Sequence, residues 1–162
     1  MMCGFFFSKL SSIINLVGAS PKRHSELKFA RKTEIAEMLN SGELETGTEA
    51  NQIRTLTRPG ATRWSSHYSS VNRLIDMFGA TCTVLENTMN NGLNNNIRGE
   101  AKGALQAMKS FEFVFILQLM NEVMGITLML CQALQSKSQD ILNVMHLIRS
   151  TKILLQELRQ YG

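Results

Sequence analysis

The acidic side chains of this 162-residue chain are too few and too scattered to form a two-metal catalytic site. The chain has two aspartates, Asp76 within a helical pattern and Asp140 near the expected start of another helix. Glu43 and Glu45 lie in a stretch without helical periodicity, where nothing holds them in a defined geometry. Because metal-assisted phosphoryl transfer needs carboxylates that converge from rigid elements, we expect no catalytic residues of this kind.

Cysteine and histidine side chains show no zinc-binding or catalytic arrangement either. The three cysteines, Cys3, Cys82 and Cys131, are far apart, and none stands at zinc-ligand spacing from another cysteine or from a histidine. Cys82 and Cys131 fall on apolar helix faces, which is typical of reduced, buried thiols rather than nucleophiles. The sequence also lacks a glycine-rich phosphate-binding loop. We therefore expect no enzyme activity, cofactor, metal or small-molecule substrate.

Basic residues point to a polyanionic partner. The formal net charge is +4, but residues 54–73 carry four arginines and no acidic residue. In that stretch Arg58, Arg63, Trp64 and His67 precede or begin an expected helix, whose free N–H groups also attract phosphates. An aromatic ring there can stack on an unpaired base, and it can equally begin the hydrophobic core. These four residues are the candidate nucleic-acid-binding site, with both uses of Trp64 left open.

Apolar periodicity predicts an all-α fold, an irregular bundle of five to six helices forming a single domain over residues 1–162. The strongest signal runs from Trp64 to Met89 in steps of 4, 3, 4, 3, 4, 3, 4, and Gly79 inside it is a candidate kink or break. Amphipathic spacing also predicts a first helix over 5–17.

Cap and turn residues set the other boundaries. Ser20 and Pro21 predict the start of a second helix that ends near Asn40. Residues 42–61 show no period. Residues 87–96 hold six asparagines and a glycine, which offer too little burial to offset the entropy of ordering, so flexible loops are expected over 42–61 and 87–97. A short helix is predicted over 98–109, and a long one over 138–160. In the last helix an apolar face is predicted at Ile141, Met145, Ile148 and Leu155.

Residues 111–134 form the most apolar segment. At 1.5 Å per residue it is long enough to span a bilayer of ~30 Å. However, Gln118, Asn121 and Glu122 lie near its middle, where a charge costs ~2.5–3.5 kcal/mol. We therefore expect a central core helix that the other helices enclose, and no membrane partner.

An ordered set of short motifs resembles hAT-superfamily transposase-like proteins, which include TTF-type zinc finger proteins with a hAT dimerisation domain and zinc finger MYM-type protein 1-like proteins. The resemblance covers roughly residues 5–160. Its motifs are Gly18-Ala19-Ser20, Thr62-Arg63-Trp64-Ser65-Ser66-His67-Tyr68, Leu74-Ile75-Asp76-Met77-Phe78, Val84-Leu85-Glu86, Ser110-Phe111-Glu112-Phe113-Val114-Phe115, Cys131-Gln132-Ala133-Leu134-Gln135 and Ser138-Gln139-Asp140-Ile141-Leu142.

The resemblance implies a helical insertion region that interrupts an RNase H-like core with three catalytic carboxylates. It places two family aspartates before Phe5 and the glutamate after Gly162, so none of them maps onto this sequence. It assigns Arg63 and Trp64 to a region close to the DNA ends, and it implies a nuclear location. Gly79 departs from the family, where an acidic residue is often found.

Two functions are therefore expected. The first is a non-catalytic remnant or fragment of a hAT-like transposase with weak nucleic-acid binding. The alternative is a helical protein–protein interaction module without DNA binding, which would associate with itself or with a protein partner through exposed apolar helix faces. Salt dependence separates them, because phosphate contacts weaken steeply as salt rises.

Overall fold

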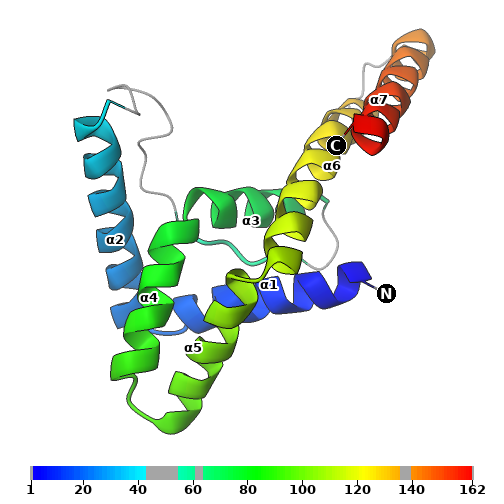
Figure 1. Cartoon of the computed structure of the whole chain (residues 1–162). Coiled ribbons are helices and arrows are strands. Elements are labelled where there is room, and N and C mark those ends of the chain that lie inside the picture. Colours follow the sequence, from blue (N-terminus) through cyan, green and yellow to red (C-terminus); the bar gives the residue numbers. More distant parts are fainter. Residues whose placement is uncertain (1, 43–54, 61–63, 136–139, 162) are drawn as a thin grey trace.

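The described residues form helices and no strand, which confirms the all-α prediction. A computed structural model describes residues 2–42, 55–60, 64–135 and 140–161 (Figure 1). In these ranges there are seven helices: α1 (Met2–Gly18), α2 (Pro21–Asn40), α3 (Trp64–Asp76), α4 (Phe78–Asn91), α5 (Asn95–Met108), α6 (Phe111–Leu134) and α7 (Ile141–Tyr161). The predicted count of five to six helices is too low.

The extra helix arises within the periodic run from Trp64 to Met89, which is broken at Met77. Met77 has φ −114° and ψ 21°, outside helical geometry, and its side chain is almost fully buried. The break therefore lies two residues before Gly79, which is inside α4. The two helices formed from this run pack on different neighbours: α3 packs on α6, whereas α4 packs on α2 and α5.

The hydrophobic core lies where α1, α4 and α5 meet, with α2, α3 and the first half of α6 closing around it. The predicted spacing of α1 is confirmed, since Phe6, Leu10, Ile13 and Val17 are all at most 2% exposed. Enclosing one such side chain stabilises the fold by about 1.5–3 kcal/mol. This core sets the position of α3, whose Val71 and Leu74 are fully buried in it.

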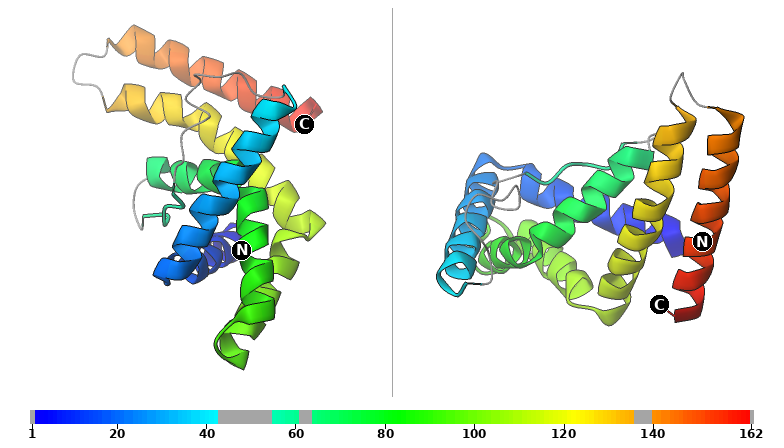
Figure 2. Two further views of the ribbon diagram at one scale, coloured as in Figure 1. Left: turned by 90° about the vertical axis from the view of Figure 1, so that its left-hand side faces the viewer. Right: turned by 90° about the horizontal axis from the view of Figure 1, so that it is seen from above.

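The helix predicted over residues 111–134 is confirmed as α6, but the prediction that the other helices enclose it is wrong. By length and composition α6 could cross a membrane, but only 22% of its most apolar 18-residue window is buried within the chain. Its fully or nearly buried side chains are Phe113, Ile116, Leu117 and Met124. Figures 1 and 2 show that the second half of α6 extends away from the core and that α7 lies antiparallel beside it.

The predicted loop over 87–97 is also wrong, because most of these residues are helical. Helix α4 continues to Asn91 and α5 begins at Asn95, three residues before the predicted start. The reason is capping: Asn94 Oδ1 accepts a hydrogen bond from the N–H of Ile97 at 2.8 Å. Arg98 Nε further donates to the carbonyl of Gly92 at 2.8 Å, which ties the start of α5 to the connection.

The remaining boundaries agree with the sequence pattern where they are described. Helix α2 begins at Pro21 after Ser20 in extended conformation, and Gly42 follows it with φ +76°. Of the predicted 42–61 loop, residues 43–54 and 61 lie outside the described residues, and 55–60 are neither helix nor strand. Helix α7 begins at Ile141; Ser138, its predicted cap, also lies outside the described residues.

Candidate nucleic-acid interface

The segment 55–60 is held against α3 by hydrogen bonds at both of its ends. Arg73 Nη1 donates to the carbonyl of Thr55 at 2.9 Å and to Thr57 Oγ1. The N–H of Gly60 donates to Ser66 Oγ at 2.7 Å. These bonds fix the backbone on either side of Arg58, whose side chain is exposed. The first candidate residue is therefore a solvent-facing cation on a positioned segment.

Trp64, at the first turn of α3, is held by α6. Its indole N–H donates to Thr127 Oγ1 at 2.8 Å, and that hydroxyl also contacts the carbonyl of Val123 at 2.8 Å. The side chain nevertheless stays 41% exposed. The indole is thus anchored to α6 through its N–H, and Trp64 lies outside the hydrophobic core.

His67 points toward α1 rather than into solvent. Its ring meets that of Phe7 edge-on, with centroids 4.7 Å apart and an interplanar angle of 66°. Its Nδ1 atom is buried and has no hydrogen-bond partner among the described atoms. His67 is therefore packed between α3 and α1, whereas the side chain of Arg58 is exposed to solvent. Arg63, the remaining candidate, lies outside the described residues.

Two residues that position this site were not singled out from the sequence. Arg73 counted only as one charge of the basic stretch, and Thr127 lies 63 residues from Trp64. No local pattern pairs residues so far apart, because the pairing depends on α3 packing against α6. The close approach of these helices is visible at Gly125, where an added Cβ would lie 3.5 Å from the Tyr68 ring.

Within the described ranges no group of three or more histidine, cysteine or acidic side chains could hold a metal ion. Cys82 and Cys131 are free thiols and are half-buried. Burial raises the pKa of the Cys82 thiol, which disfavours the thiolate that a nucleophile needs. The neighbouring ion pair of Lys109 Nζ with Glu86 Oε1, at 2.7 Å, raises the pKa of Lys109.

A second candidate surface lies on the α6–α7 hairpin. On α6, Phe111 is 83% exposed, and on α7, Ile141 and Leu142 are 75% and 73% exposed. Three of the four residues predicted as the apolar face of α7, namely Ile141, Met145 and Ile148, are exposed. Exposed apolar side chains in such numbers are typical of an interaction surface.

Comparison of the chain with protein-family models, with curated proteins and with solved structures found no match.

Proposed function

We propose that the chain is a non-catalytic helical part of a hAT-superfamily transposase-like protein that binds nucleic acid weakly through the start of α3. The ordered motifs of the sequence support the family proposal. The observation that carries the binding proposal is the anchored Trp64, which keeps 41% of its surface exposed near the positioned 55–60 segment. By the same resemblance we propose a nuclear location.

In this proposal Arg58 and Arg63 contact phosphates and the exposed part of the Trp64 ring stacks on an unpaired base. Each phosphate contact to a single strand changes the slope of log affinity against log salt by about −0.7. Two contacts therefore predict a shallow slope of about −1.4. Stacking on an aromatic ring contributes about 1–3 kcal/mol per base, so loss of the ring weakens binding by about fivefold or more.

The test is a fluorescence anisotropy titration of labelled single-stranded and duplex DNA over a series of salt concentrations. Arg58→Ala should make the salt slope shallower by about 0.7, and Trp64→Ala should weaken binding at every salt concentration. Lys102→Ala is the matched charge control, because Lys102 is exposed on α5. Thr127→Val removes the anchor of the indole but keeps the ring. Equal affinities for the wild type, Arg58→Ala and Trp64→Ala would refute the proposed site.

The family proposal has its own test in the flanking reading frame. Two aspartates encoded in frame before this segment and a glutamate after it would support a fragment of a catalytic protein. DNA cleavage or joining by the purified chain with magnesium or manganese would overturn the non-catalytic proposal, since that chemistry needs converging carboxylates.

The second candidate function is a helical interaction module, and the exposed apolar side chains of α6 and α7 favour it. It predicts that the chain associates with a protein partner through contacts that depend little on phosphate groups and therefore on salt concentration. This association should persist when Arg58 and Trp64 are substituted. The two functions use different helices, α3 and the α6–α7 hairpin, so they can be tested independently.

A further inference from the structure

We propose that α6 of one copy of this chain packs against α7 of a second copy. The proposal deepens the interaction-module function by naming the partner. It rests on two exposed stripes with the same spacing. The α6 stripe consists of Phe111, Phe115, Gln118, Glu122 and Met129, and the α7 stripe of Ile141, Met145, Ile148, Lys152 and Arg159; all ten are exposed.

Both stripes step by 4, 3, 4 and 7 residues, the spacing with which two helices pack side by side. Laid in parallel, the first two positions bring Phe111 to Ile141 and Phe115 to Met145. The fourth position brings Glu122 to Lys152. The first, second and fourth positions therefore pair apolar side chains with apolar ones or opposite charges with each other, whereas the third and fifth bring Gln118 to Ile148 and Met129 to Arg159.

The two helices also carry complementary net charge. Helix α6 contains Glu112 and Glu122 and no basic residue. Helix α7 contains Arg149, Lys152 and Arg159 against a single acid, Glu157. All of these charged side chains are exposed, and within the two stripes α6 carries Glu122 whereas α7 carries Lys152 and Arg159. Complementary charges favour contact between α6 and α7 of different copies over contact between two α6 helices.

The exposed apolar area of the α6 stripe supplies a substantial part of what a stable contact needs. An enclosed aromatic side chain buries about 150–250 Å². With exposed fractions of 83% and 53%, Phe111 and Phe115 together offer on the order of 250 Å². Met129, which is 60% exposed, and the polar side chains of the stripe add to this area, against the roughly 800 Å² per partner of a standard interface.

A second copy fits this surface better than a lipid bilayer does. Glu122 lies within the α6 stripe, where hydrocarbon would leave its carboxylate without a partner. In the proposed contact Lys152 of the other copy neutralises it. Because the two contacting surfaces are different, an open assembly keeps one free α6 stripe at one end and one free α7 stripe at the other, and larger assemblies form as concentration rises.

The first test is sedimentation velocity of the full chain over a range of concentrations, with DNA binding measured on the same samples. The wild type should associate. Glu122→Lys and Lys152→Glu should each weaken association by about tenfold, and the double variant should regain it. A chain that stays monomeric, single variants that associate like the wild type, or a double variant that stays weak would each overturn the proposal. Pelleting of the monomeric chain with anionic vesicles would also overturn the proposal.

The second test fixes the register. In the antiparallel hairpin, Met145 comes four residues after the start of α7 and Phe115 comes 19 residues before the end of α6, so the two lie roughly 20 Å apart at 1.5 Å per residue. A disulfide needs Cα atoms closer than about 7 Å. Mixing Phe115→Cys with Met145→Cys should therefore give a cross-linked pair that neither variant gives alone. The same yield from either variant alone, or none from the mixture, would refute the parallel register.

Neither test depends on the α3 interface. If the chain associates as expected but binds no DNA, only the nucleic-acid proposal fails. If it binds DNA through Arg58 and Trp64 but stays monomeric, only the second-copy proposal fails.

Discussion

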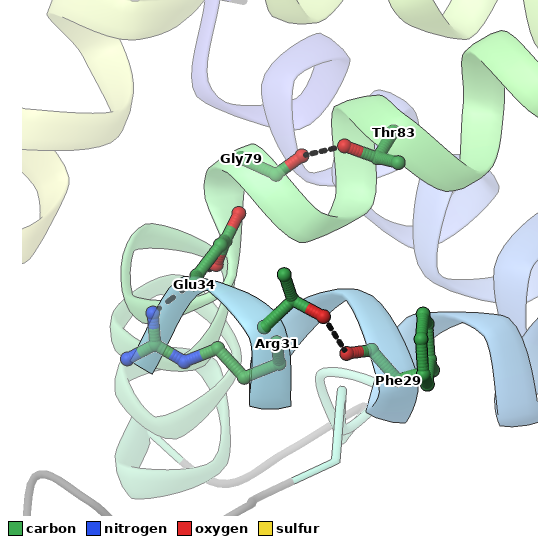
Figure 3. Close-up of polar contacts among 6 residues, drawn as sticks. Phe29, Arg31, Glu34, Gly79 and Thr83 are labelled. Carbon is green, nitrogen blue, oxygen red and sulfur yellow. Dashed lines mark hydrogen bonds and ion pairs between the residues drawn. The ribbon is translucent and has the colours of Figure 1, made fainter. Parts of the chain in front are cut away.

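Replacing Gly79 by alanine probes the contact between α2 and α4. Figure 3 shows Glu34 on α2 directed toward the first turn of α4 while its carboxylate pairs with Arg31. A Cβ added at Gly79 would overlap Glu34 Oε1, and its three nearest neighbouring atoms all belong to the Glu34 side chain. The close approach of this one carboxylate therefore accounts for a glycine within the helix.

The expected free-energy change follows from two opposing contributions. Alanine is favoured over glycine inside a helix by up to about 1 kcal/mol. Displacing Glu34 weakens its ion pair with Arg31, at 3.3 Å, and an ion pair of this partly exposed kind contributes about 0.2–1 kcal/mol. In the wild type the two contributions nearly cancel. In a Glu34→Ala background the overlap is absent, so Gly79→Ala should stabilise the fold by up to about 1 kcal/mol.

The assay is urea unfolding followed by circular dichroism for the four proteins of this double-mutant cycle. Gly103→Ala is the matched control, because a Cβ at Gly103 on α5 meets nothing within 4 Å. It should raise the free energy of unfolding by up to about 1 kcal/mol in both backgrounds. If Gly79→Ala has the same effect with and without Glu34, to within about 0.3 kcal/mol, the steric account of this glycine is refuted.

Three further predictions concern the core, a helix cap and a thiol. Leu74→Ala should lower the free energy of unfolding by about 2–5 kcal/mol in urea unfolding, because Leu74 is fully buried. Asn94→Ala should lower it by about 1 kcal/mol, through loss of the bond from the N–H of Ile97, whereas Asn94→Ser should retain most of it. Burial raises the pKa of Cys82 above its usual 9.0, so the native state holds the proton to higher pH than the unfolded chain does. Stability should therefore fall as pH rises above about 9, and the Cys82→Ala variant should lack this part of the fall in unfolding measured against pH.

Local patterns predicted much of the helical content. In α1 the spacing of Phe6, Leu10, Ile13 and Val17 identified the buried face, because a helix that packs on one side must repeat its apolar residues every three or four positions. Ser20 and Pro21 marked the start of α2. Such signals lie within one or two turns, where the chain itself sets the geometry.

The sequence-based predictions were wrong where the composition of a segment does not determine its position in the fold. The asparagine-rich stretch was predicted as a loop, but Asn94 instead caps α5 and its neighbours extend two packed helices. The run that starts at Trp64 was periodic throughout, and only the different partners of α3 and α4 explain the break at Met77.

The candidate interface shows the same division. The basic stretch and the aromatic at its centre were evident from sequence. Three contacts depend on segments that only folding brings together. They are the hydrogen bond from Trp64 to Thr127, the packing of His67 on Phe7 and the hydrogen bonds from Arg73 to the 55–60 segment. Sequence therefore identified the candidate residues, and the tertiary structure determines which of the described ones are exposed and which are packed.

Short-range periodicity predicts that the chain is helical, and side-chain transfer free energy indicates which residues are apolar enough to be buried. Whether another helix covers a given apolar face depends on how the helices pack. Phe113 and Phe115 lie two residues apart on α6, yet one is 4% and the other 53% exposed. That difference comes from which helices pack on which side of α6, and no property of either phenylalanine encodes it.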